Sequence, residues 1–296
     1  MLRSGDQIAI VANSDGLGER DLRAVAQLRD ALDDLGLRHS TGLPLDREYG
    51  ARLTPPTAHP APDRVRAEHL MEVLENPDIA AVFDVSGGQL ATGVLTHLVP
   101  DRLARSTGFF MGFSNLTTIA NALYTAGGAS SLLASPRVLG LNADVRSDFV
   151  ESCMIDDLST PARPGTRFVT PEVEFTRGRS MSGPVVGGNL GALLTLAGTP
   201  WFPSTDGAIL ALEALSPTCS TVAVGIHHLV QMGAFSGASG VLLGQFTAVE
   251  EEHGTSTIPQ LVSDIVPDIP IATTRHFGHS ADARAVMIGE PLHLSS

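Results

Sequence analysis

The stretch FFMGFSNLTTIANALYTAGG, residues 109–128, places one serine, Ser114, at the corner between an apolar strand and a helix. The run FFMGF predicts a buried strand, and NLTTIANALYTA predicts a helix that ends before a glycine pair. Two interpretations of Ser114 follow from this position. Its hydroxyl either caps the first turn of the helix, or it is a nucleophile held out on a turn.

Two glycine features favour the nucleophile. Gly112 precedes the serine closely, and the turn Ser86-Gly87-Gly88 ends the neighbouring predicted strand, IAAVFDV. A serine nucleophile on an α/β sheet needs an exposed corner where backbone N–H groups face the developing oxyanion. The pattern G-x-S-N lacks the second glycine of the G-x-S-x-G elbow, so the corner differs from that of the α/β-hydrolases.

Strands and helices alternate outward from this corner through the first half of the chain. DQIAIVANS and IAAVFDVSGG are predicted strands, each followed by a helical pattern, and such alternation predicts a parallel sheet covered by helices. Residues 140–183 are punctuated by prolines and change character. We therefore predict an N-terminal Rossmann-like α/β domain over residues 1–138, a linker over 139–165, and a smaller, β-rich α/β domain over 166–296.

Composition excludes several classes of function. The chain has 296 residues, of which 43% are hydrophobic, and a net charge of −13. Such a charge disfavours binding to nucleic acid or to an anionic membrane surface, because both depend on clustered Lys and Arg. Only two cysteines occur, and we expect neither a signal sequence nor a membrane-spanning segment, because the apolar run IAIVA near the start is short and no run approaches roughly 20 apolar residues. We expect a cytoplasmic protein.

Two short motifs carry weaker signals. The segment SDGLG at residues 14–18 follows a strand and resembles a nucleotide-binding loop, but Asp21 stands where the third glycine would fall. A plain strand–helix turn is the favoured interpretation. His276 with His279, and His227 with His228, lack the convergent spacing of a zinc site. We expect neither a metal nor another cofactor.

Several blocks of the sequence, in order, resemble the LD-carboxypeptidase family, which includes the microcin C immunity peptidases. The main blocks are GFSNLTTIANALYTAGG (112–128), VVGGNLGALLTLAGTPWFPSTDGAILALEAL (185–215) and HFGHSADARAVMIGEPL (276–292). GDQIAIVANS (5–14), NPDIAAVFDVSGG (76–88) and GVLLGQF (240–246) also fit. The resemblance therefore covers nearly the whole chain.

The resemblance implies a Ser-Glu-His triad that forms across the interface between the two domains. Ser114 falls on the nucleophile, Glu213 on the acidic member and His279 on the base. Elementary chemistry agrees, since a serine needs a base and the imidazole needs a carboxylate to fix its tautomer. Glu213 also stands in an otherwise apolar strand, where an unpaired carboxylate is costly.

The family pattern implies further roles. The backbone amides of Asn115 and Gly88 would form the oxyanion hole, and Gly87, Asn189 and Trp201 would contact the substrate. The implied activity is that of a serine carboxypeptidase or amidase that cleaves an amide next to a free carboxylate. Its substrate would be an LD-peptide of murein turnover or a peptidyl-nucleotide, and the protein would be a homodimer.

The chain departs from the family at three places. Asn115 stands where aspartate is common, and SPTCST (216–221) replaces a more acidic stretch that includes an arginine. FTRGRSMSG (175–183) has no tryptophan, although the immunity peptidases use an aromatic residue on that loop. Asn115 and the altered segment after Glu213 keep a non-catalytic ligand-binding protein on the same fold as an alternative. A nucleotide-binding regulator, based on SDGLG, is a third.

Overall fold

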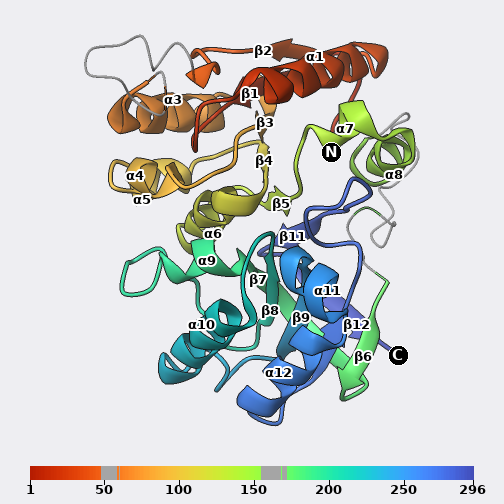
Figure 1. Ribbon diagram of the computed structural model, residues 1–296. Helices are drawn as coiled ribbons and strands as arrows, with labels where there is room; N and C mark the ends of the chain where they lie inside the picture. The colour runs from red at the N-terminus through yellow and green to blue at the C-terminus, as the bar shows by residue number, and fades with distance from the viewer. Residues whose placement is uncertain (48–58, 60, 155–167, 169–171) are drawn as a thin grey trace.

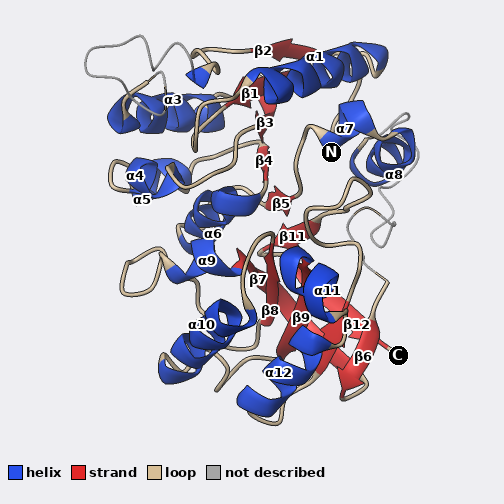
Figure 2. Ribbon diagram, in the orientation of Figure 1, coloured by secondary structure: helices blue, strands red, loops and turns tan. Residues whose placement is uncertain are grey.

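The structure is a computed structural model that describes residues 1–47, 59, 61–154, 168 and 172–296. Two α/β halves lie next to each other and share a central sheet (Figure 1). Helices lie on both sides of the strands in the N-terminal half and pack along the strands of the C-terminal half (Figure 2). No helix in these ranges is long and apolar enough to cross a membrane.

The N-terminal half is a parallel sheet, as its strand–helix alternation predicts. Its strands are β1 (Gln7–Val11), β2 (Arg38–Ser40), β3 (Ile79–Asp84), β4 (Phe109–Gly112) and β5 (Ser131–Leu133), and each neighbouring pair runs parallel. The helices are α1 (Glu19–Asp34), α3 (Asp63–Glu75), α4 (Ala91–Leu95), α5 (Pro100–Leu103) and α6 (Thr117–Thr125). Because β1, β3 and β4 are parallel, the segments that follow them meet at one edge of the sheet.

The C-terminal half is richer in strands, as predicted. Its strands are β6 (Glu174–Arg177), β7 (Ser180–Asn189), β8 (Ile209–Ala214), β9 (Gly240–Phe246), β10 (Ile271–Thr273), β11 (Val286–Ile288) and β12 (Pro291–Ser295). Strands β7 to β10 are parallel to their neighbours, whereas β6 and β12 pair antiparallel with β10 and β7. The helices are α9 (Leu190–Leu194), α10 (Cys219–Gln231), α11 (Thr247–His253) and α12 (Thr257–Ile265).

Strand β11 joins the two halves into one sheet. It pairs antiparallel with β5 and parallel with β7, which gives the order β2-β1-β3-β4-β5-β11-β7-β8-β9-β10-β6. One hydrophobic cluster likewise crosses the junction, since it includes Phe110 and Ile119 from the N-terminal half and Leu210 and Ile226 from the C-terminal half. The two halves are therefore packed on each other rather than separated by a flexible connection.

The predicted linker contains two helices. Helices α7 (Val138–Leu141) and α8 (Ala143–Cys153) occupy its first part, and Phe149 packs in the same hydrophobic cluster as Leu28 of α1. This part of the linker thus belongs to the packed N-terminal half. Most of residues 155–171 lie outside the described residues, so the domain boundaries stay a prediction.

The segment 175–183, which has no tryptophan, connects two strands that pair with different neighbours: β6 pairs with β10, whereas β7 pairs with β8, β11 and β12. It includes the end of β6 and the start of β7, with a turn at Gly178 (φ +78°). The guanidinium of Arg177 donates hydrogen bonds to the carbonyl oxygens of Ser263 (3.2 Å) and Ile269 (2.8 Å). The end of β6 is therefore fixed against the end of α12 and the loop that follows it.

Candidate active site

Ser114 stands on a strained turn immediately after β4. Its φ is +60°, and no other non-glycine residue in the described ranges has a positive φ. Such a backbone conformation costs an L-residue about 1–3 kcal/mol, and strain of this kind is concentrated at functional sites. The sharp turn lets the chain pass from β4 directly into a short 3-10 helix, Ser114–Leu116, which leads into α6.

The capping interpretation of Ser114 is wrong. The 3-10 helix begins at Ser114 itself, and the capping position is Phe113, which makes no side-chain capping bond. The Ser114 hydroxyl is half-buried and has no hydrogen-bond partner among the described residues. The side chain is thus held out on the corner rather than used to complete the helix.

The Gly87–Gly88 turn lies beside this serine. A Cβ built on Gly87 would lie 4.0 Å from the Cβ of Ser114. Gly88 has a φ of +118°, and a Cβ there would lie 2.2 Å from the carboxylate carbon of Asp15. Only glycine fits the constraints at position 88. The Gly87 and Gly88 N–H groups donate to no residue in the described part of the chain, so they are available to an oxyanion.

Asp15 explains the SDGLG segment as a structural turn. Its Oδ1 accepts hydrogen bonds from the backbone N–H groups of Gln89 (2.8 Å) and Leu90 (3.1 Å). A carboxylate therefore already occupies the amides at the start of α4 that a phosphate would otherwise use. The contact also fixes the position of the Gly87–Gly88 turn relative to β1.

The Asn115 side chain is buried behind the nucleophile. Its Oδ1 accepts hydrogen bonds from the Ser14 hydroxyl and from the Ala91 N–H, both at 2.9 Å. The side chain is thus an anchor between three segments that follow β1, β3 and β4. Its backbone N–H is the group predicted for the oxyanion hole, and that role stays a prediction.

Beneath this anchor lies a fully buried carboxylate, Asp84. It accepts hydrogen bonds from the backbone and side chain of Asn13 and from the backbone and hydroxyl of Ser86. Burial raises the pKa of Asp84 above its ordinary value, although these hydrogen bonds act in the opposite direction. The Ser86 hydroxyl in turn accepts from the Ser14 N–H at 2.9 Å, which connects this carboxylate to the Asn115 anchor.

Glu213 and His279 are brought together in the C-terminal half. Glu213 is fully buried, and its Oε2 lies 2.8 Å from Nδ1 of His279. The two atoms are at ion-pair distance but are not aligned as a directed hydrogen bond. The other imidazole nitrogen, Nε2, is buried and has no hydrogen-bond partner within the ranges the structure describes. That nitrogen is the one a serine hydroxyl would use.

The imidazole lies against the residue that precedes the nucleophile. The ring centroids of His279 and Phe113 are 4.7 Å apart, and Phe277 packs edge-on against the same phenyl ring at 6.1 Å. The predicted glutamate and histidine, from β8 and the loop after β10, thus lie together, and the histidine ring packs on the residue that precedes the predicted serine.

Asn189 contacts the acidic residue. It lies opposite Glu213 in the β7–β8 pairing, and its Nδ2 donates to Oε1 of Glu213 at 3.0 Å. Its Oδ1 accepts from the Ala192 N–H at 3.2 Å and caps α9. Both polar atoms of this side chain are thus engaged within the protein. A substrate contact for Asn189 stays a prediction, as it does for Gly87.

Trp201 is 8% exposed and packs in the hydrophobic cluster that crosses the two halves. A contact between Trp201 and the substrate therefore stays a prediction.

Three buried polar residues near the site were not predicted from the sequence. They are Thr117, Asn121 and Asp84, whose side chains hold the surrounding backbone. The signal that could have found them is the presence of polar residues within apolar segments.

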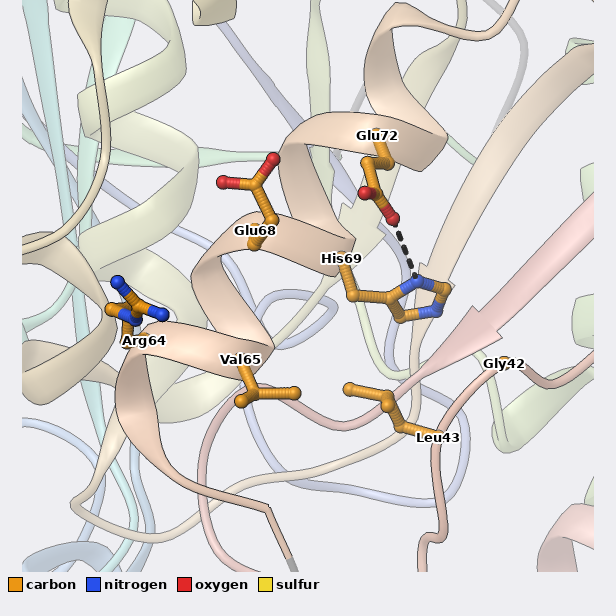
Figure 3. Close-up of a pocket in the computed structure, with 7 residues that line it drawn as sticks. All are labelled: Gly42, Leu43, Arg64, Val65, Glu68, His69 and Glu72. Atoms are coloured by element: carbon orange, nitrogen blue, oxygen red, sulfur yellow. Dashed lines mark ion pairs between the residues drawn. The ribbon is translucent and has the colours of Figure 1, made fainter.

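A separate pocket lies on the outer helix α3. Its volume is about 540 Å³, and it is lined by Gly42, Leu43, Arg64, Val65, Glu68, His69 and Glu72 (Figure 3). His69 Nδ1 lies 4.0 Å from Glu72, and burial lowers the pKa of His69. None of the predicted catalytic residues lines this pocket. Among the described residues, no group of three or more His, Cys, Asp or Glu side chains could hold a metal ion.

An α/β fold with a serine on a strained corner and a carboxylate–imidazole pair defines a class of candidate serine hydrolases. Residues 8–134 match the family described as LD-carboxypeptidase N-terminal domain, and residues 182–294 match the LD-carboxypeptidase C-terminal domain. The chain therefore belongs to the LD-carboxypeptidase family, as its sequence blocks indicate.

Two curated relatives from Bacillus subtilis align over most of their length. The putative carboxypeptidase YocD is 24% identical over 97% of this chain and 93% of its own, and a probable murein peptide carboxypeptidase is 24% identical over 97% and 88%. Solved structures confirm the fold. An MccF-like protein from Bacillus anthracis has a TM-score of 0.80 at 23% identity and covers 100% of this chain and 95% of its own.

Two further structures have informative ligands or names. The microcin C7 self immunity protein MccF, in complex with aspartyl sulfamoyl adenosine, has a TM-score of 0.79 at 18% identity and covers 99% of this chain and 94% of its own. A muramoyltetrapeptide carboxypeptidase from Oxalobacter formigenes has a TM-score of 0.73 at 24% identity and covers 98% and 95%.

Proposed function

We propose that this protein is a serine carboxypeptidase that uses Ser114, His279 and Glu213 to cleave an amide next to a free carboxylate. The observation that carries the proposal is the Glu213–His279 pair, 2.8 Å apart, packed on the residue that precedes a strained serine. Family membership supports a peptidase, and the arrangement of these three side chains supports a serine mechanism.

The reaction follows the usual chemistry of such a triad. Oγ of Ser114 attacks the carbonyl carbon of the scissile amide while Nε2 of His279 removes its proton. Glu213 faces Nδ1, holds the imidazole in the tautomer that leaves Nε2 free, and stabilises the imidazolium. His279 then gives the proton to the leaving amine. In the second half of the reaction, His279 removes a proton from a water molecule that attacks the acyl carbon, and it then returns the proton to Oγ of Ser114 as the acyl bond breaks.

The oxyanion is held by backbone amides. We propose the N–H groups of Asn115 and Gly88, because the Gly87–Gly88 turn lies beside Ser114 and its amides have no partner in the described structure. One such donor is worth roughly a hundredfold or more in turnover. None of these steps requires a metal ion.

Two substrate classes are consistent with the relatives. Murein peptides are suggested by the relative named a probable murein peptide carboxypeptidase and by the muramoyltetrapeptide carboxypeptidase structure. Aminoacyl or peptidyl nucleotides are suggested by MccF with aspartyl sulfamoyl adenosine. We favour a murein LD-peptide, because the 175–183 segment has no tryptophan, and its Arg177 is held by hydrogen bonds to the carbonyl oxygens of Ser263 and Ile269. The homodimer and the cytoplasmic location stay predictions.

The test compares the wild type with Ser114→Ala on both substrates. Release of the terminal D-amino acid from a murein tetrapeptide, and hydrolysis of an aminoacyl-sulfamoyl adenosine, are followed by mass spectrometry. We expect Ser114→Ala to lose about a million-fold in turnover while its melting temperature is kept, and a fluorophosphonate probe to label only the wild type. Labelling and turnover that persist in the variant would remove Ser114 from the mechanism.

A non-catalytic ligand-binding protein remains the second candidate, and Asn115 is the observation that favours it. A wild type that binds either ligand but neither turns over nor reacts with the probe would establish this alternative.

A further inference from the structure

The triad residues come from both halves of the molecule, so their alignment depends on how the halves meet. Ser114 follows β4 in the N-terminal half, whereas Glu213 lies on β8 in the C-terminal half. Helix α6, which begins just after the nucleophile, packs against β7, the strand next to β8 (Figure 1). The contacts between α6 and β7 therefore connect the two parts of the site, in addition to the packing of His279 on Phe113.

Asn121 holds the backbone of β7 at two points. Its side chain is fully buried, and the residues on either side of it in the chain, Ala120 and Ala122, are apolar. The Oδ1 accepts a hydrogen bond from the Gly187 N–H at 3.0 Å, and the Nδ2 donates to the Gly187 carbonyl at 2.8 Å. The same Nδ2 donates to the Thr117 carbonyl at 2.7 Å, which fixes the amide on its own helix.

Thr117 adds a third point one turn closer to the nucleophile. Its Oγ1 accepts a hydrogen bond from the Asn189 N–H at 2.9 Å, and the side chain is 1% exposed. Gly187 and Gly188 have φ values of +100° and +134°, and a Cβ on Gly188 would lie 2.4 Å from the Thr117 hydroxyl. The strand thus bends at two glycines so that its end fits closely against the start of α6.

We propose that Thr117 and Asn121 are positioning residues that align the acid–base pair with the nucleophile. The contacts form a continuous path, because Asn189 is held through its backbone by Thr117 and through its side chain to Glu213. Glu213 in turn lies against His279, whose ring packs on Phe113. The inference rests on the proposed function, since it assigns a role only if these side chains act together.

The size of the expected effect follows from the geometry of proton transfer. A misplacement of about 1 Å in reacting groups can cost on the order of a hundredfold in rate. A purely structural role predicts something different. Loss of a buried hydrogen bond would then lower the melting temperature and leave the turnover of the folded molecules unchanged.

The closing experiment compares three threonine variants of the 296-residue chain. Thr117→Val removes the acceptor for the Asn189 N–H while it keeps the shape of the side chain, and Thr117→Ser restores a hydroxyl at the same place. Thr125→Val is the matched control, because Thr125 lies on the same helix and, within the described residues, its hydroxyl donates only to the carbonyl of Trp201, at 3.4 Å. The values of kcat, KM and the melting temperature are measured for each.

We expect Thr117→Val to lower kcat by about ten- to a hundredfold with KM nearly unchanged, and Thr117→Ser to recover most of the loss. In a Glu213→Gln background the same valine substitution should have little further effect, since residues that act as a unit are not additive. The control should keep the wild-type kcat. A kcat for Thr117→Val equal to that of the control, or a loss fully additive with Glu213→Gln, would overturn the proposal.

A wild type that neither turns over substrate nor reacts with a fluorophosphonate would defeat the proposed function instead. The alignment is then tested by the ¹H–¹⁵N signals of the His279 ring, assigned with a His279→Gln variant. Movement of these signals in Thr117→Val but not in Thr125→Val supports the alignment, and unchanged signals in both refute it.

Discussion

Glu213→Gln should nearly abolish turnover while it leaves the fold intact, and the structure explains why an isosteric change is so costly. Oε1 of Glu213 accepts a hydrogen bond from the Asn189 side-chain N–H, and Oε2 faces Nδ1 of His279 at 2.8 Å. A glutamine keeps its carbonyl oxygen toward Asn189, because the alternative would place two N–H donors against each other. Its NH₂ group then faces His279.

That orientation imposes the wrong tautomer on the imidazole. Nδ1 must accept from the glutamine, so the proton moves to Nε2, which can no longer take a proton from Ser114. A comparable substitution in a serine triad lowers turnover by about 10⁴-fold, equivalent to about 5 kcal/mol of transition-state stabilisation at about 1.4 kcal/mol per decade. The assay is the release of the terminal D-amino acid, with the melting temperature measured in parallel.

A second substitution tests the reasoning rather than the residue alone. Asn189→Asp in the Glu213→Gln background supplies an acceptor at position 189, so the glutamine can turn its oxygen toward His279. We expect the double variant to regain about tenfold or more in turnover, since one favourable hydrogen bond to a charged group is worth about 1.5–3 kcal/mol. Glu213→Gln with more than a tenth of wild-type activity would refute the role of the carboxylate, and no recovery in the double variant would refute the tautomer argument.

Three other outcomes are expected. Asn115→Asp should keep the fold and change activity by no more than about tenfold, because a carboxylate oxygen still accepts from Ser14 and Ala91; activity that rises by several decades would instead mark the wild type as a degenerate binding protein. Chelators should leave turnover unchanged, because the serine mechanism needs no metal, and inhibition by EDTA that added zinc reverses would contradict it. Burial and the neighbouring Arg66 lower the pKa of His59 from 6.5 to about 4, so the unfolded chain binds more protons between these values and stability falls as the pH falls. Protonation of His59 should lower the free energy of unfolding by about 3 kcal/mol between pH 7 and pH 4. Denaturant titrations should show this pH dependence in the wild type and not in His59→Gln.

The alternation of strands and helices could be predicted from the sequence because it depends on near neighbours. Apolar runs and helical periodicity record which faces of each segment are buried, and the strand–helix corner at Ser114 follows from FFMGF, a break and an amphipathic helix. The triad residues required the resemblance as well, since a lone serine, glutamate or histidine carries no record of its partners.

Contacts between distant segments could not be predicted in this way. Ser14 and Asn115 are 101 residues apart, and Asn121 and Gly187 are 66 apart, so no local pattern links them. The sequence presents Asn121 only as a polar residue in an apolar helix, and it presents Asp15 as part of a nucleotide-like loop. Their actual partners follow from the way the sheet brings chain segments together.

By itself, then, the sequence determined the α/β class, the location of the strand–helix corner at Ser114 and the residue types available for acyl transfer. Only the tertiary structure decided that β11, from the C-terminal end, closes one sheet between β5 and β7, and that Glu213 meets His279 beside Phe113. The physical reason is that secondary structure is selected by local backbone preferences and burial, whereas a site shared by two halves depends on long-range packing. Buried polar groups such as Asn121 must find partners in that packing, and in doing so they fix how the halves meet.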